Sequence, residues 1–296
     1  MGYYSDYYRA VVVGIAALTP NMIRITLDGG DLRRFVGSGD PDERLLALVP
    51  PPGKSRAAEP IRQPDGTLDY AGDDDGPRLR SYTVRRYDPA TGQMLIDFVR
   101  HAGGVAGSWA VRAEVGDVVY LSPAKGWYAP PAGAAWQLLM ADMTALPALG
   151  RIVEELTADR RAIAVAEVIE PRDRQQIASP AEVSWRWLAG GNGHGPSRLL
   201  AALRELTMPE GRGYVWFAGE AGESRAVRKH LRHELGWSDE DFTVIGYWRS
   251  SKEQWMARYQ RVGEELEQTY LDAIASGMPQ PEALDAYEDA LEQAGL

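Results

Sequence analysis

The tetrapeptide Arg80-Ser81-Tyr82-Thr83 contains the side chains that a flavin-binding strand needs. In extended backbone, the arginine can reach a diphosphate, the tyrosine can lie against a flat heterocycle, and the threonine hydroxyl can bond a ring nitrogen. The same four residues also suit a half-buried strand that merely exposes polar side chains. The neighbouring segments therefore decide between a flavin site and an ordinary strand.

A second candidate segment runs from Asp97 to Ala110, where a strand-like stretch leads into a glycine-rich turn and a short helix. Backbone amides at the start of a helix can hold a pyrophosphate, and glycines let it approach closely. His101 by itself is weak evidence, because a lone histidine more often belongs to a turn or a core. The candidate cofactor-binding residues of this segment are Asp97, Phe98, Val99, His101, Gly103, Ala106, Gly107, Ser108 and Trp109.

Further polar candidates stand at the ends of apolar runs in the second half of the chain. Asp142 follows the run Trp136 to Ala141, and Glu220 follows the run Gly213 to Ala218. Open α/β sheets bind ligands at the carboxyl ends of their strands, so both carboxylates suit a nicotinamide cofactor, although either can instead cap a helix. Thr144 can cap the next helix with its hydroxyl, and the start of that helix can face a phosphate.

The first 130 residues favour a domain of short strands, because apolar residues alternate along them and turn residues separate them. This pattern predicts an antiparallel barrel or sandwich. Between Pro50 and Pro77 the chain is rich in Pro, Gly, Asp and Ala without a period, which predicts a long loop. The expected strands are Arg9 to Gly14, Met22 to Leu27, Arg44 to Val49, Leu79 to Tyr87, Met94 to Arg100 and Asp117 to Leu121.

After Pro130-Pro131 strand-like and helix-like runs alternate, which predicts a mostly parallel sheet covered by helices. We expect strands at Trp136 to Ala141, Arg161 to Val168, Glu182 to Leu188, Gly213 to Ala218 and Phe242 to Tyr247, with helices at Thr144 to Thr157, Ser197 to Leu206 and Ser224 to Leu235. Two more helices, from Lys252 to Ala275 and from Pro281 to Leu291, form a tail. The predicted fold is therefore α+β with two domains, residues 1–131 and 132–249, and a helical extension over 250–296.

Composition excludes several classes of protein. The 296 residues contain no Cys, so a disulfide framework, a thiolate zinc site, an iron–sulfur cluster and covalently attached haem are ruled out. The net charge of −10 argues against general nucleic-acid binding, and no stretch is long and apolar enough for a membrane span. Without a signal-peptide pattern, we expect a soluble cytoplasmic protein.

Two other motifs point to no site. His230 and His233 lie three apart on an expected helix without a third ligand, so we expect a solvated face and no resident metal. The run from Gly190 to Pro196 fails the dinucleotide fingerprint, because the last glycine position is a proline, and a flexible connection is the better interpretation.

Taken in order, the motifs resemble the siderophore-interacting protein family, flavin-dependent ferric-siderophore reductases of the ferredoxin-reductase-like superfamily. The resemblance covers roughly residues 8 to 250. This chain departs from the family pattern at Met143, where Glu is frequent, and at Ala102, where Gly is usual. Besides the two segments above, the motifs that carry it are Asp142-Met143-Thr144-Ala145-Leu146-Pro147, Trp216-Phe217-Ala218-Gly219-Glu220 and Gly246-Tyr247-Trp248-Arg249.

The resemblance implies FAD between the two domains, with Arg80 on its phosphates, Tyr82 against the isoalloxazine ring and Thr83 near the reactive edge. It also implies a ferric siderophore as substrate, with Lys54, Lys125 and Arg249 as substrate-binding cations. The electron donor that the resemblance implies is NADH or NADPH, and a ferredoxin is an open alternative. Two alternatives are a general flavin reductase or diaphorase, and a siderophore-binding protein that has lost electron transfer.

The tail carries ten acidic and four basic residues from Arg249 onward, while Met256, Tyr259, Val262 and Leu266 recur at helical spacing. An amphipathic helix of this kind needs a surface to pack on. We expect it to dock in cis beside the substrate opening and to position Arg249, with a monomer more expected than a dimer. A dimerisation helix is the alternative.

Overall fold

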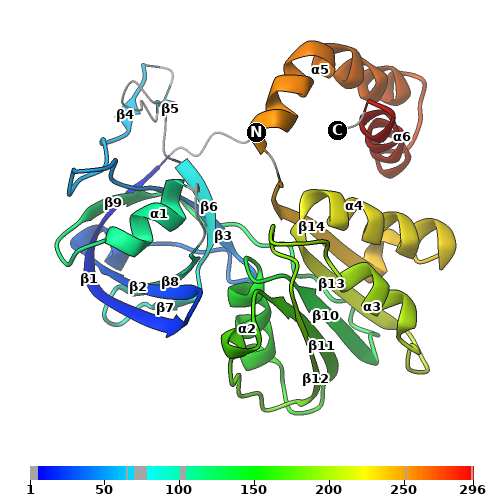
Figure 1. Ribbon diagram of the computed structural model, residues 1–296, viewed down its shortest axis with the longest axis horizontal. Helices are drawn as coiled ribbons and strands as arrows, with labels where there is room; N and C mark the ends of the chain where they lie inside the picture. Colours follow the sequence, from blue (N-terminus) through cyan, green and yellow to red (C-terminus); the bar gives the residue numbers. More distant parts are fainter. Residues whose placement is uncertain (1–5, 65, 70–78, 101–104, 251, 295) are drawn as a thin grey trace.

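The computed structural model describes residues 6–64, 66–69, 79–100, 105–250, 252–294 and 296 (Figure 1). Its first domain is a seven-stranded antiparallel sheet in the order β6-β3-β9-β1-β2-β8-β7. The strands are β1 (Tyr8–Thr19), β2 (Met22–Asp28), β3 (Arg44–Leu48), β6 (Leu79–Thr83), β7 (Arg86–Asp88), β8 (Gln93–Val99) and β9 (Val118–Leu121), and the helices are η1 (Gly30–Arg34) and α1 (Val105–Arg112).

The sheet curls into a barrel-like domain because β6 and β7 lie at its two opposite edges, yet only Val84 and Arg85 separate them in the chain. The sequence predicts one strand from Leu79 to Tyr87, and this prediction is wrong. The amide of Val84 still bonds Glu43 beside β3, whereas the amide of Arg85 bonds Leu95 on β8. The chain thus crosses the barrel seam at these two residues.

The predicted long loop also contains structure. Within it β4 (Ile61–Arg62) pairs with β5 (Leu68–Asp69) as a short hairpin, and residues 65 and 70–78 lie outside the described ranges. Gly66 has a φ of 84°, a conformation that glycine adopts without strain, so the tight turn can form.

The second domain is a five-stranded parallel sheet in the order β12-β11-β10-β13-β14, and the predicted two-domain α+β fold is confirmed. Helix α2 packs on one face, and α3 and α4 pack on the other. The strand order reverses between β10 and β13, so ligands are expected at the carboxyl ends of these strands. Its elements are β10 (Trp136–Ala141), α2 (Leu146–Glu155), β11 (Arg161–Val168), η2 (Pro171–Asp173), β12 (Glu182–Ala189), α3 (Leu199–Glu205), β13 (Gly213–Glu220), α4 (Ala221–Lys229), the π-helix η3 (His230–Glu234), η4 (Asp239–Asp241) and β14 (Phe242–Trp248).

Helix α2 also faces the barrel domain and carries ion pairs across the domain boundary. Arg151 on α2 pairs with the buried Glu43 at 2.9 Å, and Arg85 at the barrel seam pairs with Glu154 at 2.6 Å. A third link uses Asp173, which accepts hydrogen bonds from the Thr19 hydroxyl and the Asn21 amide at 2.8 and 3.0 Å. These links fix the barrel relative to the sheet.

The tail consists of α5 (Lys252–Ala275) and α6 (Gln280–Gln293), which pack against each other beyond α4 (Figure 1). It contacts the body in cis, and ion pairs join α6 to α4 and η3. Of the apolar stripe expected on α5, Met256 is 40% exposed, whereas Leu266 is buried. The acidic residues Asp285, Glu288 and Asp289 of α6 pair with Arg232, Arg228 and Lys229.

We expect removal of the tail after Ser250 to leave a folded body, because the hydrophobic cores of both domains contain no residue of the tail. The free energy of unfolding of the body should nevertheless fall by more than the about 0–1 kcal/mol of a surface pair, because the side chains in the Arg228–Glu288 and Arg232–Asp285 pairs are only 16–19% exposed. Chemical denaturation followed by tryptophan fluorescence measures this difference. Light scattering on the same sample tests whether the tail is instead a dimerisation helix. If it is, the truncated protein should have a lower mass in solution than the full chain.

Within the described ranges, none of the helices combines the length and the apolar character required to cross a bilayer.

Candidate functional site

Strand β6 forms one edge of the barrel sheet and carries the predicted flavin-binding tetrapeptide. Tyr82 is half-buried with its ring centroid 4.3 Å from that of Phe98, and burial raises the pKa of its phenol. The Arg80 guanidinium donates to the adjacent Leu79 carbonyl at 2.8 Å and has no ion pair within the described residues. Ser81 is exposed. An aromatic ring and a cation therefore lie on the same edge strand, both partly accessible.

Beneath Tyr82, the next candidate residues form the barrel core rather than an open surface. Phe98 and Trp109 are buried with ring centroids 5.5 Å apart, and the Trp109 indole donates to Asp117 at 3.2 Å. The Asp97 carboxylate is bound by Arg24 through two hydrogen bonds of 2.7 and 2.8 Å. These contacts support β8 and helix α1, and they already occupy the Asp97 carboxylate and the Trp109 indole N–H.

The remaining candidates of this segment are distributed differently. Val99 packs toward the core of the second domain, Gly107 is buried and Ser108 is exposed on α1. His101 and Gly103 lie outside the described residues, and Ala106 is placed only by its position on α1.

At the junction of the two domains, three buried polar atoms lack hydrogen-bond partners within the described part of the chain: Arg44 Nε, Thr83 Oγ1 and the Tyr247 hydroxyl. Arg44 and Thr83 are directly opposite each other in the β3–β6 pairing, so their side chains share one face. The Tyr247 ring, from β14, lies 4.3 Å from the Arg44 guanidinium carbon. Burial raises the pKa of Tyr247, whereas the positive charge of Arg44 lowers it; the Thr83 hydroxyl lies near the Tyr247 hydroxyl, but the two do not meet hydrogen-bond geometry.

Unpartnered buried polar atoms are rare in folded proteins and indicate that something else satisfies them. A flavin fits here, because its ring is flat and carries hydrogen-bonding atoms along one edge, while its diphosphate suits an accessible arginine. Tyr82 can lie against the flat ring, Thr83 can bond its polar edge, and Arg80 can bind the diphosphate. The residues present are thus compatible with FAD.

Sequence reasoning missed Arg44 altogether and did not select Tyr247 as a site residue. Tyr247 does lie in the Gly-Tyr-Trp-Arg motif, which was a usable signal. Arg44 gives no signal in the sequence, because an arginine at the start of a strand normally faces solvent.

At the carboxyl end of the parallel sheet, Asp142 is buried beside β13 and organises the start of α2. It accepts hydrogen bonds from the Thr144 amide at 2.8 Å, the Thr144 hydroxyl at 2.6 Å and the Trp248 indole. Burial raises the pKa of Asp142, and these hydrogen bonds oppose that shift. The predicted capping role of Thr144 is wrong: its hydroxyl donates to Asp142, and α2 has no side-chain cap.

Glu220 serves as the N-cap of α4, accepting hydrogen bonds from the amides of Gly222 and Glu223. Its second oxygen accepts from the Ser250 amide at 3.0 Å, so the carboxylate also anchors the chain leading to the tail. Both carboxylates thus lie at the point where the strand order reverses, and both already have intramolecular partners.

Glu167 at the end of β11 is fully buried and has one carboxylate oxygen without a partner in the described chain. Its other oxygen accepts from the Arg198 amide at 2.8 Å. Burial raises the pKa of Glu167 above its ordinary value of 4.5. The folded protein therefore holds this proton more tightly than the unfolded chain does. As a result, the contribution of Glu167 to the free energy of unfolding falls as the pH rises above 4.5.

We therefore expect Glu167→Gln to stabilise the protein at about pH 8 and to reduce the loss of stability between about pH 5 and about pH 8. Urea unfolding at several pH values measures both effects. Glu182→Gln is the matched control, because Glu182 is 77% exposed on the neighbouring strand. Equal pH profiles for Glu167→Gln and the unaltered protein would contradict the expectation.

The three expected substrate cations occupy different elements. Lys54 is exposed in the segment after β3, and Lys125 is exposed where its backbone bridges that of Arg44. The Arg249 guanidinium carbon lies 4.2 Å from the ring centroid of Trp255 on α5. Burial and the neighbouring Arg225 lower the pKa of Arg249. The tail thus covers Arg249 with an aromatic ring.

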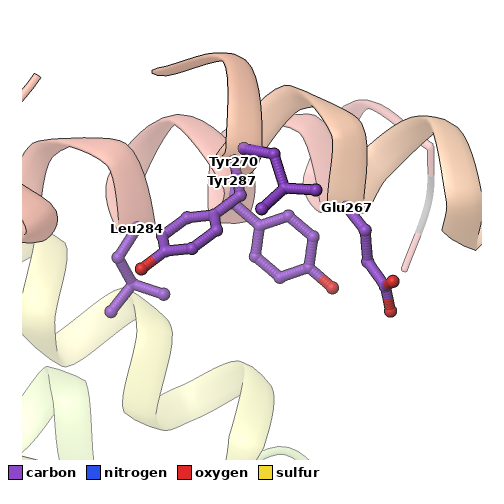
Figure 2. Close-up of a pocket in the computed structure, with 5 residues that line it drawn as sticks. Glu267, Tyr270, Leu284 and Tyr287 are labelled. Atoms are coloured by element: carbon purple, nitrogen blue, oxygen red, sulfur yellow. The ribbon is translucent and has the colours of Figure 1, made fainter. Parts of the chain in front are cut away.

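A surface cavity of about 310 Å³ lies in the tail between α5 and α6 (Figure 2). Figure 2 shows Tyr270, Tyr287 and Leu284 around it, with Glu267 at its side. It involves none of the candidate residues on β6, β10 or β14.

Two family models match the chain, one for each domain. Residues 11–127 match the siderophore-interacting FAD-binding domain, and residues 134–251 match the siderophore-interacting protein domain. The boundaries of the two matches fall near the change of architecture between β9 and β10.

Individual relatives agree with these matches. The crystal structure of a siderophore utilization protein from T. fusca is 33% identical, with a TM-score of 0.73 over 84% of this chain and 95% of that one. Ferric vibriobactin reductase ViuB of Vibrio cholerae is 28% identical over 240 residues, covering 80% of this chain and 87% of ViuB. The NADPH-dependent ferric-chelate reductase of Escherichia coli is 26% identical over 254 residues, covering 82% of this chain and 93% of that protein.

Proposed function

We propose a ferric-siderophore reductase activity for this chain, which belongs to the siderophore-interacting protein family and contains its FAD-binding domain. In this proposal NAD(P)H reduces the bound FAD, and the FAD then reduces ferric siderophores in the cytoplasm so that Fe(II) is released. NADPH is the first donor to test, because it is the donor named for the Escherichia coli relative.

One observation carries the proposal. The unpartnered, buried Thr83 hydroxyl lies on the Arg-Ser-Tyr-Thr strand of an FAD-binding domain, at the junction with the sheet whose strand order reverses. A flavin at this junction is adjacent to the place where a nucleotide donor is expected. This arrangement supports electron transfer rather than binding alone.

When bound, the flavin accepts two electrons as a hydride and releases them singly, so one NAD(P)H supports the reduction of two Fe(III) to two Fe(II). The chain's own residues have separate tasks. Arg80 binds the diphosphate, Tyr82 supports the ring, and the Asp142 edge of the sheet receives the nicotinamide. Lys54, Lys125 and Arg249 attract the anionic siderophore. Hard oxygen ligands hold Fe(II) weakly, so reduction favours release.

The test is an anaerobic titration of the purified flavoprotein, followed at the flavin absorbance. NADPH or NADH should bleach the flavin, and a ferric hydroxamate or catecholate chelate should restore the colour while an Fe(II) indicator reports two Fe(II) per flavin. Faster reoxidation by quinones or free flavins than by ferric siderophores would favour the diaphorase alternative. A flavin that neither nicotinamide bleaches would favour a binding protein, and a flavin bleached only by reduced ferredoxin would change the donor.

The substrate cations are tested separately by Lys54→Gln and Lys125→Gln. Each should raise the KM for an anionic ferric siderophore without changing the rate of bleaching by NAD(P)H, because only the second half-reaction uses them. Arg161→Gln is the control, since Arg161 is 76% exposed at the opposite end of the parallel sheet.

A further inference from the structure

Arg44 is held between two aromatic rings at the domain junction. Its guanidinium carbon lies 4.6 Å from the ring centroid of Trp127 and 4.3 Å from that of Tyr247. Its backbone is fixed as well, because Arg44 and Lys125 exchange two hydrogen bonds of 2.7 and 2.9 Å. Planar guanidinium groups stack favourably on aromatic faces, so these contacts fix the orientation of the side chain.

Arg44 contacts aromatic rings but has no carboxylate partner in the described part of the chain. Within the described residues Arg44 forms no ion pair, and its buried Nε has no acceptor. The carboxylate of Asp42, two residues before Arg44, is already bound by the amides of Trp127 and Tyr128 and by the Trp216 indole. A protein rarely buries part of a guanidinium without giving it an acceptor or a negative charge.

The position of this charge relates it to the flavin. Arg44 faces Thr83 across the β3–β6 pairing, and the Thr83 hydroxyl is equally unpartnered. Hydride transfer from NAD(P)H adds two electrons and one proton, so the flavin gains one negative charge, and NAD(P)⁺ leaves. A fixed cation beside the site stabilises that added charge without reorganising during the reaction.

We infer that Arg44 is the electrostatic partner of the flavin, a fixed cation that binds reduced FAD more tightly than oxidised FAD and thereby raises its reduction potential. The inference rests on the FAD-binding domain and deepens the proposed function by naming the residue that sets the driving force. It assigns no role in siderophore binding to Arg44.

The experiment compares the midpoint potential of bound FAD in Arg44→Gln, Arg44→Lys and the unaltered protein by dye-coupled anaerobic titration. Arg44→Gln should lower the affinity for reduced FAD relative to oxidised FAD about tenfold, which is a decrease of about 30 mV for a two-electron couple. Arg44→Lys keeps the charge and should retain most of the potential. Arg161→Gln removes a distant positive charge and should leave the potential unchanged.

A potential in Arg44→Gln equal to that of the unaltered protein would overturn the inference, as would an equal decrease in Arg161→Gln. A decrease in Arg44→Lys as large as in Arg44→Gln would also overturn it, because lysine preserves the charge. If Arg44→Gln is purified without FAD, the titration is run with saturating added FAD, after circular dichroism has verified folding.

The measurement uses dyes rather than NAD(P)H or a siderophore. It therefore tests the role of Arg44 independently of the proposed reductase activity. A protein that shows the shift but does not reduce ferric siderophores would refute the proposed function and leave the role of Arg44 standing.

Discussion

Replacing Arg80 with alanine should yield a folded protein that loses most of its FAD during purification. A charge-assisted hydrogen bond to a phosphate is worth about 1.5–3 kcal/mol, so we expect the dissociation constant of FAD to rise roughly 10- to 150-fold. Folding should be little affected, because the Arg80 guanidinium donates only to the carbonyl of Leu79 within the described residues. Fluorescence titration of the apoprotein with FAD measures the change.

Arg86→Ala is the matched control for Arg80→Ala, because Arg86 is an exposed arginine on β7, the next strand in the chain. It removes the same charge from the same domain and should leave the affinity for FAD unchanged. Unchanged affinity in Arg80→Ala would remove Arg80 from the cofactor site. An equal loss of FAD affinity in both variants would show that the overall charge of the domain, rather than a contact made by Arg80, causes the effect.

Strands and helices could be predicted from the sequence where the spacing of apolar residues within one segment defines them. The five strands and the three α-helices of the second domain were all predicted, because each apolar run is bounded by turn residues, whereas the short helices η2 and η4 were not. The break between β6 and β7 was not predictable, since Val84 and Arg85 continue the strand-like pattern and only barrel closure separates them. The short β4–β5 hairpin was missed because its two-residue strands give no period.

The candidate site was predictable where chemistry follows from neighbours in the chain, as in the β6 tetrapeptide. It was not predictable where a role depends on a partner far along the sequence. Asp97 is bound by Arg24, and Asp142, rather than Thr144, holds the start of α2. Arg44 acquires its position from Trp127 and Tyr247, which only the fold brings to it.

Asp42 should be among the most costly residues of the domain junction to replace. It is fully buried and accepts hydrogen bonds from the amides of Trp127 and Tyr128 at 2.8 and 3.0 Å. Its other oxygen accepts from the indole of Trp216 on β13 at 3.0 Å. One carboxylate thus joins the barrel, the linking segment and the parallel sheet.

Asp42→Ala leaves three N–H donors without this acceptor, among them the buried Trp216 indole, so we expect the free energy of unfolding to fall by about 3–5 kcal/mol. For a chain of this size the melting temperature should drop by about 5–8 °C. Asp42→Asn should lose about half as much, because its amide oxygen still accepts from the backbone while its NH₂ group opposes the Trp216 indole. Calorimetry on both variants measures the two losses.

Asp159→Ala provides the comparison for a carboxylate that is 76% exposed, and it should change the melting temperature little. The same Asp42 variants also affect the architecture around Arg44, because the segment that carries Trp127 depends on Asp42 for its backbone hydrogen bonds. Asp42→Ala should therefore loosen the stack on Arg44, but it also removes a negative charge from the junction, and these two changes shift the potential of bound FAD in opposite directions. The melting temperature, rather than the flavin potential, is therefore the measurement that reports on the Asp42 variants.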